Sequence, residues 1–109
     1  MRGVKESRNH MALAGRQIRQ LRSMAHHLDP IVTVGKQGVA PAVVDQTNDV
    51  LETRELIKCS VLDSSGLSVR EAADQLASRT HSEVVQVIGR RFSLYRERSR
   101  DDIEKIKLV

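Results

Sequence analysis

Apolar positions separated by polar ones predict three helices in this chain. Between residues 14 and 28, apolar side chains recur at alternating steps of four and three, which is the spacing of one helix face. A second helix is expected from about Pro41 to Thr53, because proline is common in the first turn. The third helix begins after Ser68, since Ser68 and Glu71 have the spacing of a capping box.

Four short runs of β-branched and apolar residues predict strands. They span residues 31–34, 56–62, 84–88 and 91–96. The last two form a hairpin across Gly89-Arg90, where glycine suits the first central position of a type II′ turn. The order α-β-α-β-α-β-β predicts an α/β domain of two to three layers with a four-stranded mixed sheet. Right-handed crossovers would make the first three strands parallel.

The segment Gly35-Lys36-Gln37-Gly38 joins the first strand to the second helix and is a candidate binding loop. Two glycines let the backbone approach a ligand closely, because no Cβ stands in the way. The helix beyond adds N–H groups and the positive end of its dipole, which suit a phosphate. Ala40, at the expected N-cap, has no oxygen to occupy those groups. The alternative is that glycine serves only the backbone angles of an ordinary turn.

The predicted topology gathers cations at the carboxyl ends of the parallel strands, where open sheets of this kind bind ligands. The short Asp29-Pro30 link would make the first helix antiparallel to the first strand. The rise per residue of helix and strand then places the glycine loop beside Arg19. One basic surface is then expected from Lys36, Arg16, Arg19, Arg90 and Arg91. The alternative is that these are separate solvated charges, as most arginines are. Lys58, Ser60, Gln86 and Tyr95 are candidates for a partly open sheet face, or else ordinary surface residues.

The amino-acid composition limits the kind of partner that the chain can bind. The chain is 39% hydrophobic but only 2% aromatic, so a surface of several stacked bases is not expected. The formal charge of +4 favours an acidic partner. Residues 1–10 resemble an expression leader ending before Met11 and carry half of that charge, so its distribution matters more than its total. Residues 11–96 are expected to form one domain, and 97–109 a tail of undecided conformation.

Several classes of function are not expected. Cys59 lies within an apolar strand and is predicted to be a buried, reduced core residue. No segment resembles a secretory signal or a membrane span, so we expect a cytoplasmic protein with no membrane partner. No carboxylate pair, Cys–His pair or metal-spaced cluster is evident, so neither catalysis, a metal nor a cofactor is expected. The loop also departs from the nucleotide-binding phosphate loop, because Gln37 follows its lysine.

Five stretches, in order, resemble the YhbY-type family, also called the CRM domain. They are residues 13–17, 21–30, 34–38, 54–58 and 85–90, within a similarity that runs from about Met11 to Arg96. The resemblance implies a fold similar to the C-terminal domain of translation initiation factor three, with the fourth strand between the second and third. It also likens the glycine loop to the Gly-x-x-Gly loop of KH domains, which clamps nucleic-acid backbone.

The resemblance implies RNA binding, and stand-alone bacterial members resemble assembly factors for precursors of the large ribosomal subunit. We therefore expect a monomeric, non-enzymatic protein that binds ribosomal RNA in such precursors. The family's usually basic positions correspond to Arg16, Arg22, Arg54, Lys58 and Arg90, and its loop to Gly35, Lys36, Gln37 and Gly38. Asp29 and Ala40 depart from the family pattern, which more often has a basic residue and a hydroxyl cap there. The alternative is a protein-interaction module that docks on a ribosomal or other assembly partner through the first helix or the tail.

Overall fold

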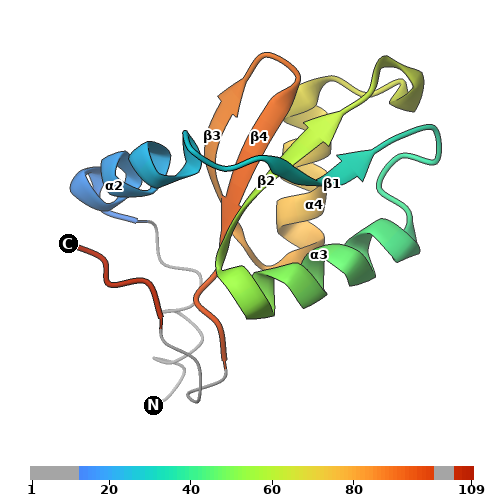
Figure 1. Cartoon of the computed structure of the whole chain (residues 1–109). Helices are drawn as coiled ribbons and strands as arrows, with labels where there is room; N and C mark the ends of the chain where they lie inside the picture. Colours follow the sequence, from blue (N-terminus) through green and yellow to red (C-terminus); the bar gives the residue numbers. More distant parts are fainter. Residues whose placement is uncertain (1–12, 100–104) are drawn as a thin grey trace.

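The predicted order of helices and strands is confirmed. The structure, a computed structural model, describes residues 13–99 and 105–109, and the expected leader at residues 1–10 lies outside them. Figure 1 shows the elements in chain order. They are α2 (Gly15–Ala25), β1 (Pro30–Val34), α3 (Pro41–Arg54), β2 (Leu56–Val61), the 3-10 turn η1 (Asp63–Ser65), α4 (Val69–Thr80), β3 (Glu83–Ile88) and β4 (Arg91–Tyr95).

The four strands form one mixed sheet in the order β1-β2-β4-β3. β1 is parallel to β2, and β4 is antiparallel to both β2 and β3. β3 therefore runs in the same direction as β1 and β2. The parallel first three strands and the inserted fourth strand are both confirmed. Gly89 has a φ of 58°, whereas Arg90 has a negative φ. This is the combination that the two central positions of a type II′ turn require.

α3 and α4 cover one face of the sheet, and the main core lies between them and the strands. The capping box at the start of α4 is present: Glu71 N donates to Ser68 Oγ at 3.0 Å, and Ser68 N donates to Glu71 Oε1 at 2.8 Å. Cys59 is buried in this core, and burial raises the pKa of its thiol to about 12. The strand residues that face the two helices alternate, as the period of a strand requires: Val32, Val34, Ile57, Cys59, Val61, Phe92 and Leu94.

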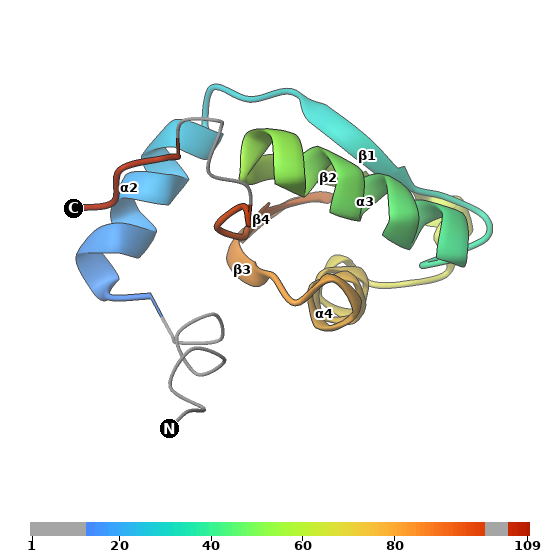
Figure 2. The ribbon, with the colours of Figure 1, turned by 90° about the horizontal axis from the view of Figure 1, so that it is seen from below.

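α2 lies on the opposite face, over the ends of the strands far from the glycine loop. Leu21 and Ala25 of α2 pack against Leu56, the first residue of β2, and Tyr95, the last residue of the antiparallel β4. Figure 2 shows α2 and α4 on different sides of β3 and β4. Tyr95, a candidate for the open face, is instead buried under α2. This burial, together with the charges of Glu55 and Glu97, raises the pKa of Tyr95 to about 12.

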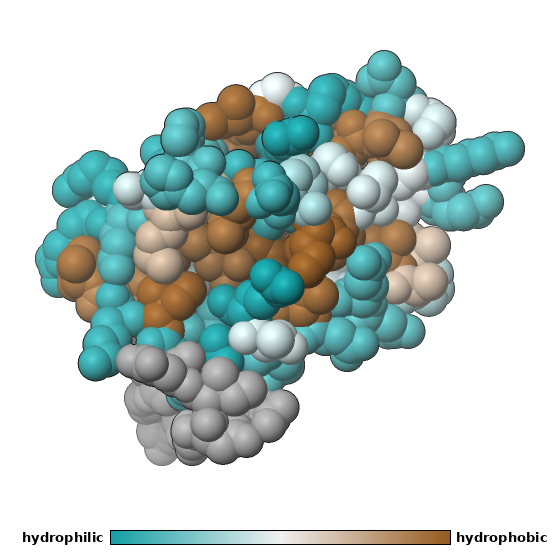
Figure 3. Space-filling view, viewed as in Figure 1, coloured by the Kyte–Doolittle hydropathy of each residue, from teal (hydrophilic) through white to brown (hydrophobic). Residues whose placement is uncertain are grey.

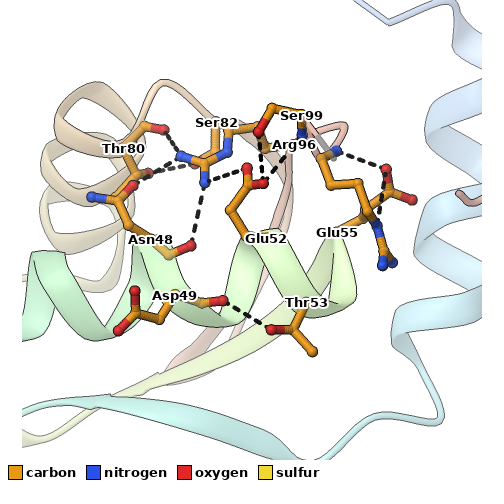
Figure 4. A network of polar contacts seen from close by, with 10 residues as sticks. Asn48, Asp49, Glu52, Thr53, Glu55, Thr80, Ser82, Arg96 and Ser99 are labelled. Carbon is orange, nitrogen blue, oxygen red and sulfur yellow. Dashed lines mark hydrogen bonds and ion pairs between the residues drawn. The ribbon is translucent and has the colours of Figure 1, made fainter. Parts of the chain in front are cut away.

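The C-terminal segment is anchored to the end of α3, as Figure 4 shows. Arg96 Nη1 donates to the Asn48 side chain at 2.8 Å, and its Nη2 lies 3.1 Å from Glu52. The buried Glu55 carboxylate accepts the backbone N–H of Arg98 at 2.8 Å and that of Ile106 at 2.6 Å. Ile106 and Leu108 then pack into the cluster beneath α2, so residues 105–109 brace that helix without forming a helix or strand of their own.

Candidate nucleic-acid interface

The glycine loop forms a tight turn whose tip is exposed. Gly38 N donates to Gly35 O at 2.8 Å, which leaves Lys36 and Gln37 at the two central positions. Both of these side chains are exposed. Gly38 has a φ of 67°, a conformation that favours glycine, whereas a Cβ at Gly35 would meet Leu62 Cδ1 at an ordinary 3.7 Å. Glycine is therefore required by the backbone at Gly38 only, and the space beside Gly35 would also accept a Cβ.

The base of this loop is held rigidly. Val39 is buried, and its carbonyl accepts a hydrogen bond from Arg79 Nη1 at 2.8 Å. Ala40 is the N-cap of α3 and makes no side-chain cap, as predicted. On the other flank, Leu62 N donates to Val34 O at 2.9 Å, which ties the end of β1 to the end of β2. A turn fixed at both ends can present its tip to a ligand with little loss of conformational freedom.

Arg90 lies at the same edge of the sheet, but its side chain is already engaged. Its Nε donates to Val61 O at 3.1 Å, and its Nη2 donates to Leu67 O at 3.4 Å. Nε is also 3.5 Å from the Asp63 carboxylate, which is almost fully exposed. Arg90 therefore joins the hairpin to the η1 turn beside the glycine loop. Its first role in this structure is to hold that edge together.

The expected convergence of Arg16 and Arg19 with Lys36 is wrong. Figures 1 and 2, taken at right angles, both place α2 at one end of the molecule and the glycine loop at the other. The reason is that α2 ends at Ala25, three residues earlier than predicted, and does not turn back along β1. Its apolar side chains pack instead on β2, β3 and β4, because the cluster that buries them lies beneath those strands.

The two other predicted arginines also lie away from the loop. Arg22 is exposed, and its Nε donates to the carbonyl of Val85 at 2.8 Å, so it fastens α2 to β3. Arg54 is the last residue of α3 and lies just before Leu56, at the amino end of β2. The structure brings together, at the carboxyl edge, the glycine loop with Arg90 and Arg91. It separates this group from Arg16, Arg19, Arg22 and Arg54.

A second feature, which we call the sheet-face hollow, lies where α2 leaves the open face uncovered. Its volume is about 160 Å³. The residues that line it come from β2, β3, β4 and the end of α2: His26, Lys58, Gln86, Ile88, Arg91, Phe92 and Ser93. Lys58 and Gln86 could be placed on this face from the alternation of the strands. The contribution of His26 could not, because it depends on how α2 docks.

Both features carry cations whose side chains are free to meet a ligand. The side chains of Lys36, Lys58 and Arg91 make no hydrogen bond or ion pair with another residue of the described chain. Figure 3 shows hydrophilic side chains projecting from the end of the molecule where Figure 1 places the glycine loop. Cations with free donors on an exposed loop and a polar recess are suited to phosphate groups.

Other kinds of site find little support in the part of the chain that the structure describes. Over residues 13–99 and 105–109, no group of three or more His, Cys, Asp and Glu side chains could hold a metal ion. Across the same ranges, each helix is too short or too polar to pass through a bilayer.

Comparisons with known proteins find similar sequences and a similar fold. Residues 13–96 match the model of the CRS1 / YhbY (CRM) domain. The probable RNA-binding protein YqeI of Bacillus subtilis is 46% identical over 85 residues, which cover 78% of this chain and 88% of that protein. A probable RNA-binding protein of Methanocaldococcus jannaschii is 40% identical over 79% of this chain and 65% of its own length. The fold is also similar to the solution structure of a hypothetical protein from Staphylococcus aureus, with a TM-score of 0.67. The two sequences are 42% identical, and the alignment covers 87% of this chain and 100% of the Staphylococcus aureus chain.

Proposed function

The chain belongs to the CRS1 / YhbY (CRM) domain family, and from that premise we propose that it is an RNA-binding protein without catalytic activity. Two relatives that it matches along most of its length are named as probable RNA-binding proteins. The observation that carries the proposal is the turn at Gly35–Gly38, with Lys36 exposed at its tip and no Cβ on either glycine that flanks the tip. Such a turn can follow a sugar–phosphate backbone closely, while the cation neutralises a phosphate.

RNA contacts extend, in this proposal, from the turn to the uncovered sheet face. Arg91 faces that side from the edge of the hairpin, and Lys58 lies further along it. Gln37, Gly38 and Arg90 complete the loop end of the surface. Arg16, Arg19, Arg22 and Arg54 contact only an RNA that is long enough to reach the far end of the molecule. Because phosphate contacts carry no sequence information, the surface recognises backbone and shape.

We take the natural ligand to be ribosomal RNA in a precursor of the large subunit, bound by a monomer in the cytoplasm that acts as an assembly factor. The domain would comprise residues 11–96, followed by a tail in which residues 105–109 brace α2. A protein-docking role is less well supported. The apolar side of α2 already packs on the sheet, and Ile106 and Leu108 of the tail fill the same cluster.

Crosslinking in cells tests the proposal. A tagged copy of the chain is irradiated with ultraviolet light in growing bacteria, and the attached RNA is sequenced. We expect precursor large-subunit RNA to dominate, and the yield to fall when Lys36→Ala and Arg91→Ala are combined. A combined Arg16→Ala and Arg19→Ala variant removes the same charge and should lose less yield, because these arginines contact only the part of a long RNA that reaches the far end of the molecule. Recovery of no RNA, or of the same RNA in equal yield from the Lys36 and Arg91 variant, would contradict the proposal.

A further inference from the structure

The sheet-face hollow differs from the glycine turn in shape and chemistry. The turn is a projecting tip that offers backbone and one cation. The hollow is a recess that offers an amide from Gln86, a hydroxyl from Ser93 and cations from Lys58 and Arg91. A projecting loop suits the sugar–phosphate backbone of a nucleic acid. A recess lined by an amide, a hydroxyl and cations suits a ring-shaped ligand with a polar edge.

The polar groups of the hollow form a row across three strands. Lys58 of β2 pairs with Ser93 of β4, and Ser93 pairs with Gln86 of β3. Lys58 and Gln86 are half-buried, and their side chains have no hydrogen-bond or ion-pair partner among the residues that the structure places. The donors and acceptors of these two side chains are therefore available to a ligand that enters the hollow.

The size and charge of the hollow limit what it can hold. At about 160 Å³ it is well below the roughly 300 Å³ at which pockets for drug-sized ligands begin, so it suits one ring rather than a whole nucleotide. None of its lining residues is acidic, and Lys58 and Arg91 make its rim positive. The Gln86 amide offers both a donor and an acceptor, and the exposed Ile88 offers an apolar surface.

We infer that the hollow takes one unpaired nucleobase of the bound RNA, with its edge on the Gln86 amide and its flanking phosphates near Lys58 and Arg91. The inference rests on the proposed function and deepens it. The base comes from a single-stranded segment, because bases within an A-form helix are stacked and their deep groove is closed to side chains. The hollow thereby adds a base preference that the phosphate contacts of the glycine turn cannot supply.

Fluorescence anisotropy with short labelled RNAs tests the inference. The RNAs are homopolymers of U, A and C and a strand of equal length that lacks its bases. Gln86→Ala is compared with wild type and with Gln75→Ala, a matched control on the exposed side of α4, which packs on the other face of the sheet. Gln86→Glu keeps the size of the side chain and adds a negative charge near the expected phosphates, and thermal melting checks that every variant is folded.

We expect wild type to prefer one homopolymer and to bind the baseless strand more weakly. Gln86→Ala should lower affinity for the preferred homopolymer by about fivefold, roughly the effect of one hydrogen bond, and leave the baseless strand unchanged. Gln86→Glu should lower the affinity for the preferred homopolymer further, and Gln75→Ala should bind it as wild type does. Equal losses for all RNAs would assign the hollow to phosphate and overturn the inference. Unchanged binding by Gln86→Ala, alongside a loss in Lys36→Ala, would overturn it while leaving the proposed function intact. Failure of wild type to bind any RNA would overturn both.

Discussion

Arg90 and Val61 are joined by two hydrogen bonds. Val61 N donates to Arg90 O at 2.8 Å, and Arg90 Nε donates to Val61 O at 3.1 Å. The pair fixes the end of β2 to the hairpin that follows β3, next to the glycine loop. The neighbouring Arg91 is exposed and has no such partner within the described chain. We therefore expect the adjacent arginines to have separable roles: Arg90 chiefly holds the edge, and Arg91 chiefly contacts the RNA.

Substitution of these two arginines should separate stability from binding. Arg90→Ala keeps the backbone bond to Val61 but removes the side-chain bonds to the Val61 and Leu67 carbonyls, and should lower the free energy of unfolding by about 1–2 kcal/mol. Arg91→Ala should change it by less than about 0.5 kcal/mol, as at an ordinary surface position, but weaken RNA binding. Urea unfolding and fluorescence anisotropy measure the two effects. Equal destabilisation by both substitutions would contradict this division.

The two loop glycines should also respond differently. Gly38→Ala places a Cβ on a residue with a φ of 67° and should cost about 1 kcal/mol of stability. Gly35→Ala meets only an ordinary contact with Leu62, so stability should be nearly unchanged. Its methyl group instead obstructs close approach, and RNA affinity should fall about tenfold, the effect of losing one charge-assisted hydrogen bond. Wild-type affinity for RNA in Gly35→Ala would show that the backbone there is not a contact.

Glu55, at the end of α3, should contribute far more to stability than the exposed Glu97 of the C-terminal segment. It is fully buried, accepts two backbone N–H groups and lies 3.8 Å from Arg98 Nε. Glu55→Gln leaves the buried Arg98 without its counter-charge and should cost about 3 kcal/mol in urea unfolding. Glu97→Gln, which breaks the more exposed pair with Lys105, is the control and should cost less than about 1 kcal/mol. Similar costs for both variants would contradict the anchoring role of Glu55.

Glu52 should give the fold a component of stability that is lost in acid. Partial burial alone would raise its pKa, but hydrogen bonds from Ser99 and the charge of Arg96 outweigh burial, so the net pKa is below the usual 4.5. The unfolded chain therefore takes up the proton first. This stability is present above about pH 4.5 and is lost as the pH falls through the lower pKa of the folded state.

Urea unfolding of Glu52→Gln across this range measures that component. At pH 7 the variant should be less stable than wild type by at most about 1 kcal/mol, as expected for a partly exposed ion pair. The difference should shrink as the pH drops below 4.5. A difference that stays constant down to pH 3 would show that the ionised carboxylate contributes nothing specific.

Local signals in the sequence were sufficient for most of the fold. The spacing of Ser68 and Glu71 set the start of α4, and Gly89 set the hairpin turn, because each depends only on residues nearby in the chain. The fourth strand lies between the second and third, as the family resemblance implied. The turn at Gly35–Gly38 was likewise found from local sequence, since glycine spacing governs local backbone geometry.

The features that the sequence could not predict depend on contacts between distant segments. The position of Arg16 and Arg19 follows from α2 packing on Leu56 and Tyr95, and no spacing within α2 encodes those partners. The engagement of Arg90 with Val61 is similarly a contact across 29 residues. His26 joins the sheet-face hollow for the same reason, because its position follows from the docking of the whole helix.

The salt dependence of RNA binding tests the central claim most directly. With Lys36, Lys58 and Arg91 on phosphates of a single strand, log affinity should fall against log salt with a slope of about −2, at about −0.7 for each contact. Combining Lys36→Ala with Arg91→Ala should bring the slope to about −0.7 and weaken binding at low salt. The equal-charge control, Arg16→Ala with Arg19→Ala, should keep the wild-type slope on a short strand. A wild-type slope near zero, or one that the Lys36 and Arg91 substitutions leave unchanged, would contradict the account.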